Sequence, residues 1–277
     1  MSIRLTTLSE NTAGRVGVLA EWGLSVLVEI NDYKVLLDTG LDMSAAYNAA
    51  ILGVDLSTID RIVISHGHRD HTGGLQRVLS AIRRKVEIIA HPDIWAAKYS
   101  RTFSTKEQYA GIPFSREALE SLGAVFTFST QPVWLAENIV TSGEIPMHTD
   151  YEKVDSELFV REGGQFHPDP LRDDLALIVK SDKGLVVILG CGHRGIINTL
   201  YHAREIAGEE HIHMVIGGTH LINASRGQID LTVTALKELG VEKIGVSHCT
   251  GLPAAAILFQ EFGGGFFFNN TGRIITI

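Results

Sequence analysis

The part of this chain that decides its fold is the stretch SHGHRDHTGG at residues 65–74. Three imidazoles and one carboxylate fall close together in it, at His66, His68, Asp70 and His71. Neutral imidazole and carboxylate are ligands of divalent cations, and a bound cation offsets the cost of gathering such polar groups in one place. The glycines of the stretch let the backbone turn tightly around whatever the side chains hold. The stretch therefore predicts a metal site, and the alternative interpretation is a solvated polar loop.

Apolar periodicity places this stretch between a strand and a helix. Residues 61–64 are a short β-branched run, and apolar side chains recur at helical spacing from Leu75 to Ile82. Comparable patterns predict strands at 25–30, 34–37, 86–90, 175–179, 186–189, 213–216 and 243–246, and helices at 196–203 and 229–239. Each half has a hairpin first and a strand–helix–strand later. The sequence therefore predicts an α/β fold of two packed mixed β-sheets with helices on the outer faces.

The pattern of residues 91–147 is irregular. One helix is clear in it, with Ser115 as its N-cap and Gly123 as its stop signal. Aromatic side chains are spread along the rest of the segment, at Trp95, Tyr99, Phe103, Tyr109 and Phe114. We interpret the segment as a lid or pocket insertion in a single domain that spans residues 1–277.

Composition and charge exclude several classes of partner. The 277 residues carry 24 basic and 32 acidic side chains, a net charge of −8, which predicts no nucleic-acid partner and no anionic membrane surface. The start of the sequence does not have the pattern of a secretion signal, and no run of apolar residues has the length that spans a membrane, so we expect neither feature. Its two cysteines do not make a disulfide framework. We therefore expect a cytoplasmic protein that acts on a small molecule, and the oligomeric state stays open.

The spacing His66-x-His68-x-Asp70-His71 resembles the signature of the metallo-β-lactamase superfamily. The upstream LLDTG at residues 36–40 resembles the first motif of the same superfamily. The resemblance implies an αβ/βα sandwich with a dinuclear metal site at one edge. It also implies that His66 and His68 bind the first metal, and that Asp70 and His71 bind the second. Asp38 would orient the metal loop by hydrogen bonding, and a plain turn residue is its alternative interpretation.

Four further motifs are similar to one subgroup of that superfamily. They are PDPLRDD at 168–174, LGCGHRG at 189–195, GGTHL at 217–221 and SHCTG at 247–251. Members of the subgroup are usually described as dihydropterin-ribofuranosylaminobenzene-phosphate-synthase-like. The description follows similarity and does not fix the substrate of this chain.

The chain departs from the superfamily pattern at one ligand. Pro170 stands where the superfamily has a loop histidine, so another residue is needed to complete the first metal site. We favour His193 as that ligand, with Cys191 and His167 as alternatives. Cys191 occupies a strand end where the superfamily has a bridging aspartate, or a cysteine in some lactamases. Two alternative interpretations of Cys191 are that it contacts the ligands or the substrate without binding a metal, and that it is a buried, inert thiol.

Two more histidines follow predicted strands at the same edge. His248 matches the last histidine of the superfamily, and we expect it to bind the second metal. His220 is expected to contact either the substrate or the ligands, because histidine ligands need partners that fix their tautomer.

The sequence thus predicts a metal-dependent hydrolase. A metal-bound hydroxide would attack a small-molecule ester, lactone, amide or phosphate-containing substrate, with Asp70 as the catalytic carboxylate. Two zinc ions fit the ligand set, and iron or manganese fit it too. The alternative is a metal-stabilised binding, sensor or redox protein without hydrolytic turnover.

Overall fold

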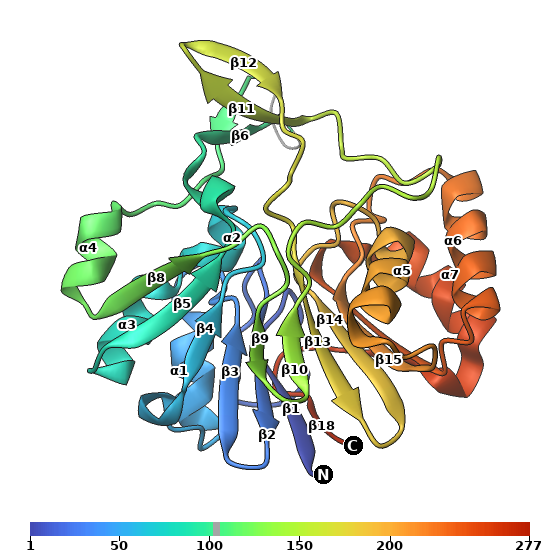
Figure 1. The fold of residues 1–277 in the computed structure, drawn as a ribbon, viewed down its shortest axis with the longest axis horizontal. Coiled ribbons are helices and arrows are strands. Elements are labelled where there is room, and N and C mark those ends of the chain that lie inside the picture. The colour runs from blue at the N-terminus through green and yellow to red at the C-terminus, as the bar shows by residue number, and fades with distance from the viewer. Residues whose placement is uncertain (102–105) are drawn as a thin grey trace.

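A computed structural model describes residues 1–101 and 106–277. Phe103, which belongs to the predicted insertion, lies outside the described residues. Two seven-stranded sheets pack face to face, and helices cover the outer side of each (Figure 1). This arrangement confirms the predicted αβ/βα sandwich of two mixed sheets.

The first sheet holds the N-terminal strands and has the order β18-β1-β2-β3-β4-β5-β8. Its strands are β1 (Ile3–Ser9), β2 (Ser25–Ile30), β3 (Tyr33–Leu37), β4 (Arg61–Val63), β5 (Val86–Ala90), β8 (Ala124–Phe128) and β18 (Ile274–Thr276). The pair β2 and β3 forms the predicted hairpin, and β3, β4, β5 and β8 run parallel. Helices of this half are α1 (Ser44–Ile51), α2 (Arg69–Thr72), α3 (Leu75–Ile82) and α4 (Arg116–Ser121), with short turns η1 (Leu56–Thr58) and η2 (Pro92–Trp95). The Ser115 hydroxyl accepts the Ala118 amide, which confirms the predicted N-cap of α4.

The second sheet has the order β17-β16-β15-β14-β13-β10-β9. Its strands are β9 (Trp134–Ala136), β10 (Ile139–Thr141), β13 (Ala176–Ser181), β14 (Gly184–Leu189), β15 (Ile212–Gly218), β16 (Lys243–Ser247) and β17 (Phe266–Phe268). Its outer face packs against α5 (Ile196–Ala207), α6 (Arg226–Glu238) and α7 (Leu252–Phe262), while η3 (His248–Thr250) and η4 (Gly263–Gly265) are short turns. The hairpin of β13 and β14 and the two helices after it confirm the predicted order of elements. Over the part of the chain that the structure describes, no helix has the length and apolar character that crossing a membrane requires.

A third, small sheet stands above the sandwich (Figure 1). It has the order β12-β11-β6-β7 and consists of β6 (Lys98–Ser100), β7 (Gln108–Tyr109), β11 (Leu158–Glu162) and β12 (Gln165–Pro168). The segment predicted as an insertion, 91–147, therefore contributes to all three sheets, since β8, β9 and β10 extend the two large ones. The half of the small sheet at residues 158–168 has no counterpart among the predicted strands.

The centre of the sandwich is an apolar layer between the two large sheets. Side chains from both sheets meet there, for example Val28 and Leu37 from the first sheet and Leu177 and Ile188 from the second. All four are fully buried. Burial of such side chains is the main favourable contribution to folding, so this layer holds the two halves together and fixes the edge where the loops meet.

We expect Leu177→Ala to lower the free energy of unfolding by about 2–5 kcal/mol, because the truncation leaves a cavity in a close-packed layer. Chemical denaturation monitored by circular dichroism measures the change. Leu231→Ala on α6 is the matched control, since the Leu231 side chain is 49% exposed and its loss should change stability by no more than about 0.5 kcal/mol. Equal losses in the two variants would contradict this description of the core.

Candidate metal centre

The predicted site residues meet at one edge of the sandwich, where several strands end. His66 follows β4, Cys191 and His193 follow β14, and His220 and His248 follow β15 and β16. These strands run parallel within their sheets, so their carboxyl ends lie at the same edge. Residues that are far apart in the sequence are thereby brought into contact.

Asp38 orients the metal loop through a fully buried carboxyl group. Its Oδ1 accepts the Ser65 amide at 2.7 Å, and its Oδ2 accepts the Ser65 hydroxyl at 2.6 Å and Nδ1 of His71 at 2.6 Å. Because the Ser65 hydroxyl gives its one proton to Asp38, it accepts from Nδ1 of His66 at 2.9 Å. Both histidines therefore donate a hydrogen bond through Nδ1 and direct Nε2 into the site.

His66, His68 and His193 form the first group of donor atoms. One ligand atom from each lies within 4.8 Å of the others, and Nε2 of His193 lies 3.2 Å from Nε2 of His66. Nε2 of His68 and Nδ1 of His193 are buried and have no hydrogen-bond partner. Burial, together with the neighbouring imidazoles, holds the pKa of His66 and of His193 well below the ordinary value, and burial lowers the pKa of His68 to about 3. These three rings are thus neutral donors.

Asp70, His71 and His248 form the second group. Nε2 of His248 lies 3.2 Å from Oδ2 of Asp70, and Nε2 of His71 lies 4.0 Å from the same oxygen. Burial acts to raise the pKa of Asp70, but His71 and His248 outweigh it and hold the pKa below its ordinary value. Burial alone would lower the pKa of His71, yet Asp38 and Asp70 raise it to about 9. The second group therefore pairs an ionised carboxylate with a protonated His71, whose Nε2 proton a bound cation would displace.

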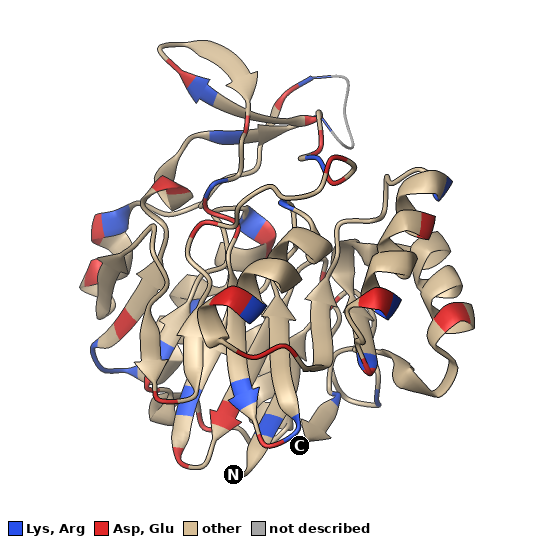
Figure 2. Cartoon of the chain, turned by 45° about the vertical axis from the view of Figure 1, so that its right-hand side comes forward, with Lys and Arg blue, Asp and Glu red and all other residues tan. Residues whose placement is uncertain are grey.

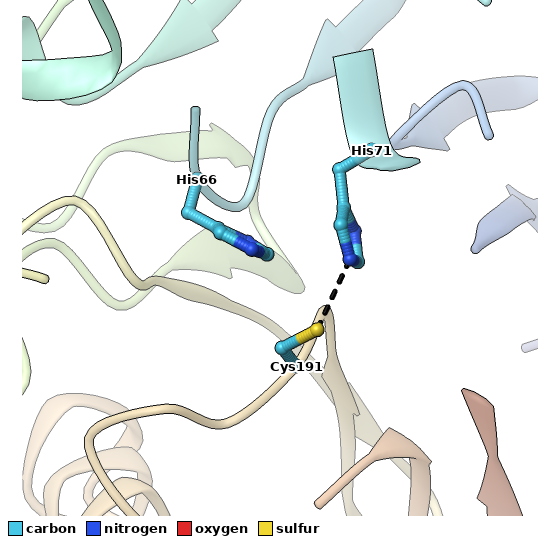
Figure 3. A group of neighbouring side chains, drawn as sticks. All are labelled: His66, His71 and Cys191. Atoms are coloured by element: carbon cyan, nitrogen blue, oxygen red, sulfur yellow. Dashed lines mark hydrogen bonds between the residues drawn. The ribbon is translucent and has the colours of Figure 1, made fainter. Parts of the chain in front are cut away.

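Cys191 lies between the two groups. Its Sγ is 3.1 Å from Nε2 of His71, and Figure 3 shows the thiol directed at that nitrogen, with His66 beside it. The sulfur also lies within 4.8 Å of donor atoms of His193 and His220, and of His248 and Cys249. Burial raises the pKa of the Cys191 thiol. The structure thus places both His193 and Cys191 near the predicted metal loop.

This donor set fits divalent cations. Neutral imidazole nitrogens at short mutual distances and a carboxylate are the ligands that zinc, iron and manganese accept. Nε2 of His68 is buried without a hydrogen-bond partner, which is costly, and a cation in the first group would remove that cost.

Residues near the N-terminus hold His248 in place, and the sequence analysis did not identify them. Glu10 accepts the His248 amide at 2.8 Å, and Asn11 contacts Nδ1 of His248 at 2.9 Å and donates to its carbonyl oxygen. His248 has a φ of 51°, a strained conformation for a histidine. Because more than two hundred residues separate these partners, no local pattern signals their contact.

The remaining histidines differ in position. The His220 ring lies 4.1 Å from the His193 ring, and its Nε2 lies 3.6 Å from Oδ2 of Asp155. It borders the cavity above the donor groups, where both of its predicted roles are possible. His167 lies exposed on β12 and belongs to none of the donor groups found among the described residues.

A cavity of about 310 Å³ opens above the two donor groups. The small sheet lines one side of it through Ser100, Gln108, Tyr109 and Leu158. Other walls carry apolar or aromatic side chains, at Trp22, Leu41 and Ile222, and Arg69 is a basic side chain at the border. The pocket is therefore mostly apolar, with the donor atoms gathered at its base.

The chain belongs to the metallo-β-lactamase superfamily, whose family model matches residues 23–248. It is 34% identical over 290 residues to the 7,8-dihydropterin-6-methyl-4-(β-D-ribofuranosyl)-aminobenzene-5′-phosphate synthase of Methanocaldococcus jannaschii, covering 99% of this chain and 96% of that protein. It is also similar to Tm1679, a metal-dependent hydrolase of the β-lactamase superfamily, with a TM-score of 0.86, 32% identity and coverage of 99% and 98%. The metallo-β-lactamase fold protein YhfI from Bacillus subtilis has a TM-score of 0.59 at 14% identity, covers 100% and 99%, and shares the fold. These matches confirm the resemblance on which the predicted fold rests.

We expect His193→Ala to lose metal from the first group, because its Nε2 faces that of His66, while Cys191→Ser retains metal at both. Elemental analysis of protein purified in excess zinc measures the content. His167→Ala is the matched control, because it removes an exposed imidazole from β12. Full occupancy in His193→Ala would contradict the assignment, as would a sulfur-to-metal charge-transfer band in the cobalt-substituted protein.

Proposed function

We propose that this protein is a metal-dependent hydrolase that acts on a small molecule. His66, His68 and His193 would hold the first cation, and Asp70, His71 and His248 the second. The observation that carries the proposal is the juxtaposition of two donor groups at the base of one cavity. Membership of the superfamily and the similarity to Tm1679 support it.

The bound cations would supply a hydroxide nucleophile at neutral pH and polarise a carbonyl or phosphoryl oxygen. The residues of the chain provide the rest. Asp38 fixes the tautomers of His66 and His71 through the bonds described above, so that both present Nε2 to the site. The Asp70 side chain is 20% exposed and borders the cavity, so its carboxylate is placed to accept the proton of the attacking water.

The cavity supports a small-molecule substrate. Its volume of about 310 Å³ is at the lower end of the range for small-molecule pockets. Trp22 and Tyr109 offer apolar surface, and Arg69 offers a positive charge at the border for an anionic group. Acidic and basic residues are interspersed along the ribbon in the view of Figure 2, and the net charge of the chain is −8. An ester, lactone, amide or phosphate-containing small molecule is therefore favoured over a nucleic acid.

A synthase reaction is the second candidate, favoured by the 34% identity to the methanogen protein over nearly the whole chain. Isotopically labelled water separates the two. A hydrolase places the heavy oxygen in one of its products, whereas a synthase that joins two substrates leaves its product unlabelled.

We expect Asp70→Asn to lose the second metal and to lower the hydrolysis rate by about 10²–10⁴-fold, the range for loss of an acid–base group. The substitution keeps the size of the side chain and removes the charge that supports the second cation. Zinc content and turnover of a panel of p-nitrophenyl esters, lactones and bis(p-nitrophenyl) phosphate are the measurements. Asp42→Asn, at an exposed ion pair with Arg77, is the matched control. Turnover near that of the unchanged protein would show that Asp70 has no catalytic role, and metal binding without any turnover would favour a binding or sensor protein.

A further inference from the structure

The segment between β12 and β13 holds three buried aspartates that the proposed reaction does not use. Asp169, Asp173 and Asp174 are at most 5% exposed. They belong to the PDPLRDD stretch at residues 168–174. Buried carboxylates are costly unless they are paired, so each needs a partner that accounts for its position.

Asp173 and Leu175 form hydrogen bonds with the backbone on both sides of His66. Oδ2 of Asp173 accepts the Gly67 amide at 2.8 Å, and the Leu175 amide donates to the Ser65 carbonyl at 2.9 Å. Gly67 lies against the backbone of Ile94 and has no room for a side chain, because a Cβ atom there would lie 2.3 Å from the carbonyl oxygen of Ile94. The loop that carries His66 and His68 is therefore fixed from this segment.

Asp174 forms a hydrogen bond with the loop that carries His193. Its Oδ2 accepts the amide of Arg194, the residue after His193, at 2.9 Å. The Arg194 guanidinium in turn donates to the carbonyl oxygens of Ile145 and Pro170, at 2.6 Å and 2.8 Å. Two adjacent carboxylates thus reach two loops that come from different sheets.

Lys98 joins this arrangement to the small sheet. It lies on β6, is 1% exposed, and its Nζ donates to Asp169 at 2.8 Å and to Oδ1 of Asp173 at 2.9 Å. Burial alone would lower the pKa of Lys98, but the two carboxylates raise it, so the side chain stays charged. Both oxygens of Asp173 are therefore occupied, one by the small sheet and one by the metal loop.

We propose that Asp173 and Asp174 are positioning residues that hold the loops of His66, His68 and His193 at the separation a cation requires. Lys98 ties this pair to the small sheet that lines the cavity. The inference rests on the proposed metal site. This segment supplies the contacts that hold the loop of His193 beside the loop of His66 and His68.

Zinc affinity of the full-length protein tests the proposal, measured by competition with a chromophoric chelator on apo-protein shown to be folded by circular dichroism. We expect Asp173→Asn to weaken zinc binding about 10–100-fold, the usual loss when a contact that orients a ligand is removed. The substitution replaces one carboxylate oxygen with an NH2 group, which is a hydrogen-bond donor. This group would face either the Gly67 N–H or the Lys98 ammonium, which are also donors, so one hydrogen bond would be lost. Asp174→Ala should weaken zinc binding by a similar factor, because it leaves the Arg194 amide unpaired.

Two conservative variants make the test specific. Asp174→Asn should keep near-normal affinity, because its carbonyl oxygen still accepts the Arg194 amide while Oδ1 of Asp174 has no partner to lose. Asp60→Asn removes a carboxylate that accepts the Lys34 amide at 2.8 Å, at the opposite end of β4 from the site, and should leave zinc affinity unchanged.

A purely structural role of Asp173 and Asp174 predicts a different result. In that case the substitutions would lower the melting temperature of the apo-protein. The zinc affinity of the folded protein, and the rise in melting temperature on adding zinc, would stay unchanged. Zinc affinity within about twofold of the unchanged protein in both Asp173→Asn and Asp174→Ala would overturn the proposal while the metal site stands. Failure of the unchanged protein to bind zinc, iron or manganese would instead overturn the proposed function, and this inference with it.

Discussion

The metal centre depends on one buried carboxyl group at the end of β3. Asp38 is fully buried and accepts three hydrogen bonds, two from Ser65 and one from His71. These bonds join β3 to the loop after β4 and settle which nitrogen of two histidines carries the proton. Without these bonds, His66 and His71 could each present Nδ1 instead of Nε2 to the site. The closely spaced rings would then repel one another. The orientation of the ligands is therefore built into the sheet before any cation binds.

The buried region around the donor atoms is unusually polar. Five histidines of the two donor groups are at most 7% exposed, namely His66, His68, His71, His193 and His248, and a fold rarely buries so many imidazoles together. Neutral rings of the first group and the ionised carboxylate of the second make two donor sets of different charge. Each set is held from outside by residues on other elements, Asp38 for the metal loop and Glu10 with Asn11 for His248. A bound cation, as proposed, would make this arrangement favourable.

Local patterns in the sequence could predict much of the fold and of the site. Contacts between residues that are far apart in the sequence could not be predicted in this way. The His66 to His71 spacing identified the metal loop because its ligands are neighbours on the chain, and the alternating runs identified the β2–β3 and β13–β14 hairpins for the same reason. The small sheet was missed because β6 pairs with β11, more than fifty residues later, and both are short. Glu10 and Asp173 each look like an ordinary surface carboxylate in the sequence. Only the fold shows that they accept amides of the metal-binding loops.

In the proposed site, two cations divide the six donors at this edge into two groups. A crystal structure of the zinc-loaded protein, with anomalous scattering measured at the zinc edge, would locate both cations. We expect two anomalous peaks about 3.5–4 Å apart, one bound by His66, His68 and His193 and the other by Asp70, His71 and His248. A single peak bound by Cys191, Cys249 and His248, or no peak at this edge of the sandwich, would contradict the account.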